Sequence, residues 1–321
     1  MDALVTGGSG FVGLRLIRRL VEDGHVVRAL ARSDAAADKV TEAGAKPVPG
    51  DLSDFAILAE AMSGSDVVFH SAARTSRGGG RDAFERDNVT GTRNVVAGAR
   101  RAGVRRLVHV GTEAALMTGQ ALVDVDEAAP LRPDSPAPYA ASKAKAEQVV
   151  LAANGEDLET VVLRPRLVWG TGDSTVLPEL VAAVQTGRFA WIGGGRHLTA
   201  TTHVDNVVLG VLLAAERGRP GEAYFVTDGE PIVFRDFVTE LLATQGVTAP
   251  GRSMPELPAR IATSAGETLW RRLGLSGAPP LDYMSLWLSS KECTIDIGKA
   301  RTELGYQPIR TRAEGFAELR A

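Results

Sequence analysis

Hydrophobic residues occur along the first half of the chain in short runs, separated by longer stretches in which apolar and polar positions alternate at helical spacing. The short runs predict buried strands at residues 3–6, 26–31, 46–49, 67–70, 107–110 and 160–163. The longer stretches predict helices at residues 11–23, 34–43, 53–62, 84–102 and 139–153. Strands and helices that alternate in this way build a parallel sheet with right-handed crossovers, so we expect an α/β fold with a doubly wound sheet.

The pattern changes after Pro165. Glycine and proline interrupt shorter elements there, although residues 201–204 and 223–227 still have the composition of strands. Residues 258–273 predict an amphipathic helix. We therefore predict a first domain over residues 1–165, to which residues 198–230 return, and a smaller, interleaved C-terminal lobe over residues 166–321.

Composition and charge narrow the class of protein. Hydrophobic residues make up 44% of the chain and charged residues 23%, as in ordinary globular proteins. The net charge of -3 provides no basic field for binding nucleic acid. Cys293 is the single cysteine, so we expect no internal disulfide and a reducing compartment, the cytoplasm. No stretch approaches the roughly 20 apolar residues that a membrane span requires.

A glycine-rich turn, Thr-Gly-Gly-Ser-Gly-Phe-Val-Gly, joins the first predicted strand to the first predicted helix at residues 6–13. Gly7 allows a tight turn, Gly10 lets backbone amides approach a pyrophosphate, and Gly13 lets the helix pack closely on the strand. The amides at the start of the helix then face the anion. Because strand and helix are both predicted, the turn favours a Rossmann-type dinucleotide site over a tight turn without a ligand.

The end of the second strand indicates which dinucleotide binds. An acidic residue there would hold the ribose 2′-hydroxyl of NAD, but the strand ends in Ala31 and Arg32. Arg32 can pair with a 2′-phosphate, so we expect NADP, with NAD as the alternative if Arg32 is only a solvated surface residue. Asp51, at the end of the third strand, either contacts the adenine or caps the helix that follows.

Tyr139 and Lys143 are four residues apart in a predicted helix, which places both on one face. A phenol with a pKa near 10 is a poor base at neutral pH, and a nearby cation lowers that value. Thr112 ends the fifth strand, at the edge where parallel sheets bind ligands, and either holds a substrate oxygen or caps the next turn. The three residues predict proton transfer at a carbonyl or hydroxyl group.

Together these motifs resemble the extended short-chain dehydrogenase/reductase family over nearly the whole chain. The resemblance also uses His70-Ser-Ala-Ala73, Asn88-Val-Thr-Gly-Thr92, Leu163-Arg-Pro165 and Thr202-His-Val-Asp-Asn206. It implies that Thr112, Tyr139 and Lys143 are catalytic and that Asn88 supports the site. The cofactor contacts that it implies are Gly7, Gly10, Phe11, Val12, Gly13, Arg32, Asp51, Leu52, Ala72, Ala73, Asn88, Tyr139, Lys143 and Pro165.

Within that family the chain is most similar to 3β-hydroxysteroid dehydrogenase-like reductases, a group that includes bacterial 2-alkyl-3-oxoalkanoate reductases. The similarity lies in residues 191–206, in the helix before Leu273 and in residues 293–306. It implies an NAD(P)-dependent oxidoreductase that interconverts a ketone and a secondary alcohol on an apolar, steroid-like or acyl substrate. It also implies a homodimer, and a helix at 258–273 that lines the substrate pocket rather than anchoring the protein to a membrane.

Three other functions are compatible with this fold. A sugar-nucleotide dehydratase of this family would carry Thr-Asp-Glu where this chain has Thr112-Glu113-Ala114, which disfavours dehydration. An epimerase usually has an aspartate where Ala31 stands, which disfavours epimerisation. A cofactor-sensing protein tends to lack the tyrosine or the lysine, and both are present. His197 and His203 have no partners at metal-ligand spacing, so we expect no metal.

Overall fold

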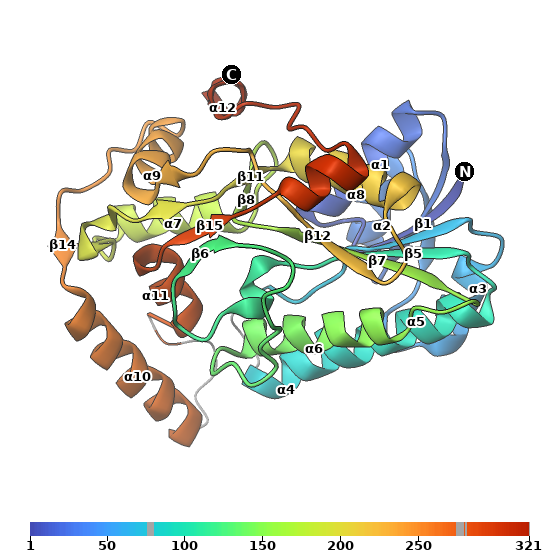
Figure 1. Cartoon of the computed structure of the whole chain (residues 1–321), viewed down its shortest axis with the longest axis horizontal. Coiled ribbons are helices and arrows are strands. Elements are labelled where there is room, and N and C mark those ends of the chain that lie inside the picture. Colours follow the sequence, from blue (N-terminus) through green and yellow to red (C-terminus); the bar gives the residue numbers. More distant parts are fainter. Residues whose placement is uncertain (76–79, 274–278, 280, 321) are drawn as a thin grey trace.

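The computed structural model describes residues 1–75, 80–273, 279 and 281–320. A seven-stranded sheet forms the centre of the larger part of the molecule, and helices cover both of its faces (Figure 1). A second group of short strands and helices lies at one end of that sheet. None of the helices among the described residues is long and apolar enough to cross a membrane.

The central sheet has the strand order β12-β7-β5-β4-β1-β2-β3, and every neighbouring pair is parallel. Its strands are β1 (Asp2–Thr6), β2 (Val26–Ala31), β3 (Lys46–Pro49), β4 (Val67–His70), β5 (Arg106–Val110), β7 (Glu159–Pro165) and β12 (Glu222–Val226). The chain reverses its direction of winding between β1 and β4, as a doubly wound sheet requires. The predicted Rossmann-type α/β fold is thus confirmed.

Six helices cover the two faces of this sheet. One face carries α1 (Phe11–Glu22), α2 (Asp34–Glu42) and α8 (Val204–Arg217); the other carries α3 (Phe55–Met62), α5 (Gly91–Arg101) and α6 (Pro138–Ala152) (Figure 1). Each set of helices buries its own apolar cluster against the sheet. The cluster on the first face contains Ile17 and Val207, and the cluster on the second contains Leu58 and Val95. Burial on both faces explains why the strands read as nearly continuous apolar runs.

The helix predicted over residues 84–102 is three elements rather than one. A short helix α4 (Gly80–Phe84) leads into a π-helical segment η1 (Glu85–Thr90), and only then does α5 begin. The periodicity of apolar residues did not reveal this because a π-turn adds a residue without interrupting the helix. The π-turn contains Asn88, which the site uses.

The second lobe contains a four-stranded sheet in the order β13-β10-β15-β6. Its strands are β6 (Leu122–Val125), β10 (Leu198–Thr199), β13 (Ile232–Val233) and β15 (Cys293–Ile295). Around it are two strand pairs, β8 (Val168–Trp169) with β11 (Thr202–His203) and β9 (Trp191–Ile192) with β14 (Ser253–Met254), and the helices α7 (Val176–Gln185), α9 (Phe234–Ala243), α10 (Glu256–Leu273) and α11 (Tyr283–Ser290).

The stretch 198–230 contributes to both the large sheet and the small one. Of residues 198–230, β10 lies in the small sheet, whereas α8 and β12 lie on and in the large one. The strand expected at 201–204 is only the two residues of β11, because Val204 already begins α8. The side chain of His203 accepts a hydrogen bond from the backbone N–H of Asp205, which starts that helix early.

Candidate active site

The glycine turn is held against the end of β4. Gly7 has φ +72, and a Cβ placed on it would lie 2.5 Å from the backbone nitrogen of Ala72. A Cβ on Gly13 would lie 2.2 Å from the carbonyl oxygen of Gly7, so α1 packs directly on the turn. The N–H of Gly10 donates to the Gly7 carbonyl at 3.0 Å, and Gly10 is exposed at the start of α1. The turn therefore has the shape of a pyrophosphate cradle at a helix N-terminus.

The other residues expected at the cofactor lie around this turn or at the same end of the sheet. Phe11 and Val12 form the first turn of α1, and the ring of Phe11 faces Gly172 from a loop of the second lobe. Ala72 and Ala73 follow β4, and Pro165 is the last residue of β7. Leu52 packs on Gly91 at the start of α5. These are all positions at the carboxyl ends of parallel strands, where open α/β sheets bind ligands.

Arg32 and Asp51 follow neighbouring strands, β2 and β3, and are both exposed. Asp51 does not cap α3, because Asp54 does so by accepting from the N–H of Ile57. Instead, one Asp51 oxygen accepts hydrogen bonds from the N–H and the hydroxyl of Ser53 at 2.9 and 2.8 Å. These bonds lower the pKa of Asp51, and the charge of Arg32 lowers it further. Of its two predicted roles, capping is therefore wrong.

Asn88 connects three parts of the site. Its side-chain oxygen accepts from the backbone N–H of Arg74 at 2.6 Å, and its amide donates to the hydroxyl of Ser142 at 2.9 Å. The Ser142 hydroxyl in turn donates to the carbonyl of Tyr139 at 2.8 Å. The π-turn at Asn88 thus fixes the segment after β4 relative to the first turn of α6.

Thr112 is buried at the end of β5, where it caps the short 3-10 helix η2 (Glu113–Leu116). Its hydroxyl oxygen accepts from the N–H of Ala114 at 3.2 Å and donates its proton to Glu113 at 2.7 Å. The helix η2 packs against α6, which carries Tyr139, and Thr112 lowers the pKa of the Tyr139 phenol. The structure therefore shows the capping role.

Glu113 and Arg166 form a buried ion pair beside Thr112. One carboxylate oxygen accepts from Thr112, and the other accepts from the Arg166 guanidinium at 2.5 Å. Arg166 also donates to the hydroxyl of Thr199 in the second lobe. Both oxygens of Glu113 are thus engaged. Sequence reasoning used Glu113 only to disfavour dehydration and missed Arg166, although a second arginine directly after Arg164 and Pro165 was an available signal.

Tyr139 lies in the first turn of α6, partly buried, with its ring edge against Phe84 at 6.2 Å between centroids. Burial raises the pKa of the phenol, and the negative charge of Glu113 raises it further, while Thr112 acts in the opposite direction. In this state of the site the phenol holds its proton firmly, which is the form needed to donate to a substrate.

Lys143 lies one turn after Tyr139 and is 3% exposed. Its ammonium donates to the carbonyl of Val110 at 2.8 Å and lies 3.4 Å from Nε2 of His109. Burial lowers the pKa of Lys143 to about 8, against the opposing charge of Glu147. The ammonium is therefore close to its titration point at neutral pH.

A pair of buried histidines lies behind Lys143. His70 is bonded to the hydroxyls of Thr6 and Thr92 at 2.7 and 2.9 Å, and its ring lies 5.0 Å from that of His109. Burial and the charge of Lys143 lower the pKa of His70 to about 3, and the pKa of His109 is also far below its usual value. Both rings are therefore neutral at physiological pH.

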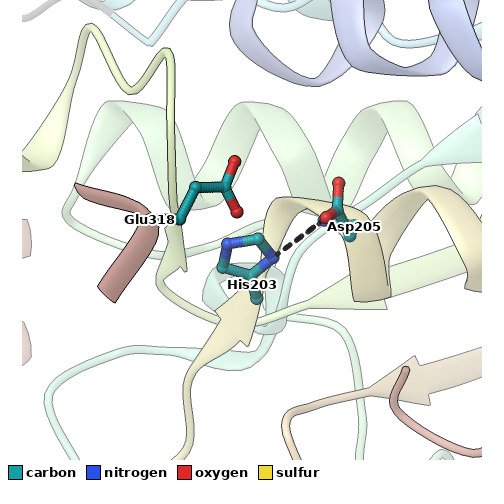
Figure 2. Close-up of side chains that lie close together, drawn as sticks. All are labelled: His203, Asp205 and Glu318. Carbon is teal, nitrogen blue, oxygen red and sulfur yellow. Dashed lines mark hydrogen bonds and ion pairs between the residues drawn. The ribbon is translucent and has the colours of Figure 1, made fainter. Parts of the chain in front are cut away.

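A cluster of titratable side chains outside this site joins α8 to α12 (Arg312–Arg320). Figure 2 shows His203 between Asp205 and Glu318. Asp205 does not cap α8; it accepts two hydrogen bonds from Arg15 and two from Arg310. Burial raises the pKa of Asp205, but these arginines outweigh it and the net shift is downward. Two guanidinium groups at the carboxylate make the cluster a structural ion-pair network.

Comparison with known proteins places this site in a family. Residues 4–257 match the model of the 3-beta hydroxysteroid dehydrogenase/isomerase family. The chain belongs to that family. It is 48% identical to a 4-hydroxy-2-methyl-3-oxo-4-farnesyl-3,4-dihydroquinoline-1-oxide ketoreductase from Stigmatella aurantiaca, over 100% of this chain and 96% of the relative. It is 39% identical to a 2-alkyl-3-oxoalkanoate reductase from Stenotrophomonas maltophilia, over 100% and 99%.

A solved structure has the same fold. A double mutant of the dTDP-glucose 4,6-dehydratase DesIV from Streptomyces venezuelae, solved with NAD bound, has a TM-score of 0.76 and 26% identity, over 99% of this chain and 95% of that one. The family member described here is an NAD(P)-dependent oxidoreductase of the extended short-chain dehydrogenase/reductase type. It interconverts a ketone and a secondary alcohol, and the epimerase alternative is not favoured.

Proposed function

We propose that this enzyme reduces an apolar ketone with NADPH and that Thr112, Tyr139 and Lys143 carry the reaction. The observation behind the proposal is the position of these residues. Thr112 caps η2 just after β5, and η2 packs against α6, which carries Tyr139, at the end of the parallel sheet where the glycine turn also lies. Lys143 lies one helical turn further along α6.

The chemistry divides between cofactor and chain. A nicotinamide dinucleotide held by the glycine turn would supply the hydride for the carbonyl carbon of the substrate. Tyr139 donates its phenolic proton to the carbonyl oxygen, and Thr112 holds the oxygen in place. Lys143 binds the ribose and stabilises the phenolate left on Tyr139. Proton uptake from solvent restores the phenol.

We propose NADP rather than NAD because of the charge at the end of β2. Arg32 follows Ala31 where an acidic residue would select the 2′-hydroxyl, and Asp51 lies near enough for its pKa to respond to Arg32. The turn fits a dinucleotide because its tight path, on which a Cβ at Gly7 or Gly13 would collide with neighbouring backbone, leaves Gly10 exposed at the start of α1.

We propose an apolar substrate for two reasons. The relatives named above act, by their names, on a farnesyl-substituted quinoline oxide and on alkyl-substituted oxoalkanoates. In this chain the helix α10 of the second lobe exposes apolar side chains, namely Leu257, Ile261, Leu269 and Leu273. We propose that these side chains line the substrate site and receive a ketone that carries a long hydrocarbon group.

The remaining proposals concern the state of the protein in the cell. We propose a cytoplasmic enzyme, because its single cysteine, Cys293, is buried and free. We propose a homodimer on the basis of the family resemblance. Sedimentation of the purified protein measures the oligomeric state, and fractionation of the producing cells measures the location.

The decisive test is Tyr139→Phe. We expect the rate of single-turnover NADPH oxidation with a 2-alkyl-3-oxoalkanoate or a 3-ketosteroid to fall by at least ~100-fold, because a general acid contributes that much. Tyr224→Phe is the matched control, since Tyr224 lies on the edge strand β12 and its phenol donates to Glu303, outside the site, so we expect its loss to leave the chemistry intact. Near-wild-type rates for Tyr139→Phe would sink the assignment. A wild-type protein that binds NADPH but oxidises none with any ketone would instead support an epimerase or a cofactor sensor.

A further inference from the structure

His109 is a polar residue in the buried strand β5, and its ring faces the helix that carries Lys143. It lies two residues after Leu107, so both side chains are on the same face of the sheet. Leu107 packs there in an apolar cluster with Val150 of α6. His109 is 1% exposed, and its Nε2 lies 3.4 Å from the ammonium of Lys143.

The donors of the two groups decide the direction of this hydrogen bond. An ammonium has three N–H groups and no acceptor, so Lys143 donates and Nε2 of His109 accepts. Burial and the charge of Lys143 lower the pKa of His109 far below its usual value, so the ring is neutral. A neutral imidazole carries one N–H, which therefore lies on Nδ1. That Nδ1 has no hydrogen-bond partner among the residues that the structure describes.

The neighbouring ring of His70 is satisfied at both nitrogens. The Thr92 hydroxyl donates its single proton to the Asn88 carbonyl at 2.6 Å, so it accepts from Nε2 of His70 at 2.9 Å. Nδ1 of His70 then accepts from the hydroxyl of Thr6 at 2.7 Å. By contrast, the buried N–H of His109 is unfavourable for stability. It is tolerated in the ring whose other nitrogen receives Lys143, which points to a role for that contact.

We propose that His109 is a positioning residue that holds the Lys143 ammonium on β5 together with the Val110 carbonyl, which leaves one ammonium hydrogen for the cofactor ribose. The inference rests on the proposed function, which assigns Lys143 to the ribose. The Val110 carbonyl accepts from the same ammonium at 2.8 Å. Two acceptors from adjacent residues fix the end of a flexible four-carbon side chain, so cofactor binding does not have to order it.

The other charged and titratable side chains around Lys143 come from the elements packed against α6. They are Tyr139 and Glu147 on α6, Glu113 on η2, Glu85 and Asp87 on η1, Arg164 on β7 and His70 on β4. The charged side chains of α4 and α5 are exposed. Of this set, Glu147 raises the pKa of Lys143, and it is paired with Arg164 at 2.6 Å. Substitutions at residue 109 change none of these groups.

The first test determines the tautomer in the protein without substrate. Nitrogen-15 NMR of the histidine rings at pH 7 distinguishes a nitrogen that carries a proton from one that accepts a hydrogen bond. We expect the proton on Nδ1 in His109 and on Nε2 in His70, with each ring assigned from the loss of its signals in His109→Gln and His70→Gln. A proton on Nε2 of His109 would overturn the proposal, because that nitrogen could not accept from Lys143.

The second test compares His109→Leu with His109→Gln, whose amide oxygen can take the place of Nε2 as an acceptor. At pH 6, where Lys143 is charged, we expect His109→Leu to raise the Kd for NADP⁺ by between about twofold and tenfold, because the ammonium must then be ordered on binding. The alkaline rise in Kd should begin about one pH unit lower, since the charge has lost an acceptor. His109→Gln should restore both. A leucine variant with the wild-type Kd at every pH would reject the inference.

Lys143→Met supplies the background that separates positioning from packing. In that background His109→Leu should leave the Kd for NADP⁺ unchanged, because there is no ammonium to hold. An equal loss with and without Lys143 would show that His109 acts by packing and would overturn the proposal. If His109→Leu does not fold, His109→Asn replaces it, since the asparagine amide takes the place of Nδ1 rather than Nε2. These measurements need no turnover, so their failure leaves the Tyr139→Phe result, and with it the proposed function, intact.

Discussion

The amide of Asn88 donates to the hydroxyl of Ser142 across 2.9 Å, which joins the π-turn η1 to the helix that carries Tyr139 and Lys143. Both side chains are buried. The position of the catalytic helix thus depends on a residue 51 positions before Tyr139, through a contact that no local sequence pattern contains.

Asn88→Ala should therefore weaken the site and the fold together. It removes the bond that the Asn88 oxygen accepts from the N–H of Arg74 and the bond that its amide donates to the Ser142 hydroxyl, so we expect the free energy of unfolding to fall by about 1–3 kcal/mol. Ser142→Ala, which removes one of these bonds, should cost less. Urea denaturation of both variants measures the difference, and an Asn88→Ala variant as stable as Ser142→Ala would contradict the linking role.

Gly7→Ala should abolish cofactor binding for two reasons. The new methyl group would collide with the backbone of Ala72, and the alanine would have to adopt a positive φ. Gly24→Ala separates the two effects. Gly24 has φ +79 with open space around it, so its substitution carries the backbone strain alone, about 1 kcal/mol. Titration of NADPH fluorescence against each folded variant measures the outcome. Equal cofactor affinities would show that the close approach to Ala72 is unimportant.

Arg32→Ala should raise the KM for NADPH about tenfold or more and leave the KM for NADH unchanged, since a charge-assisted hydrogen bond to phosphate contributes ~1.5–3 kcal/mol. Arg101→Ala, exposed at the end of α5, is the control for loss of a surface charge. Initial rates with NADPH and with NADH give the KM of each variant for each cofactor. A parallel rise for NADH would remove the argument for NADP.

Cofactor affinity should depend on pH through Lys143. Because burial lowers the pKa of this residue to about 8, its ammonium is lost as the pH rises through that value. We expect the Kd for NADP⁺ to be flat below pH 8 and to rise by up to tenfold per unit above it. Lys143→Met should bind weakly with no such dependence. A rise of the same size in that variant would assign the titration to another group.

The fold should lose stability in acid through its buried histidines. His70, with a pKa of about 3, takes up a proton only on unfolding when the pH lies below about 6.5, and His109 behaves in the same way. Stability is therefore complete above pH 6.5 and falls as the pH drops toward 3, by ~1.4 kcal/mol per unit for each histidine. Urea denaturation at pH 7 and pH 5 should show a smaller loss for His109→Gln than for the wild type. His25→Gln, near the N-terminus, should match the wild type.

Local sequence patterns were sufficient for the large sheet. Each strand there is buried by helices on both faces, so its apolar run is visible in the sequence, and β2, β3 and β4 begin and end at the predicted residues. The strands of the second lobe were mostly missed because several have only two residues, too few to show any period. The division of the chain at residue 165 stays a prediction.

The sequence by itself determined the doubly wound sheet, the glycine turn and the spacing of Tyr139 and Lys143, because each depends on residues close together in the chain. Only the tertiary structure decided what those residues contact. It brings Arg166 from the end of β7 to Glu113 after β5, and Glu113 also accepts a hydrogen bond from the Thr112 hydroxyl. It also places the Lys143 ammonium at the Val110 carbonyl, since packing of α6 on the sheet, rather than helical spacing, sets the direction of a buried side chain.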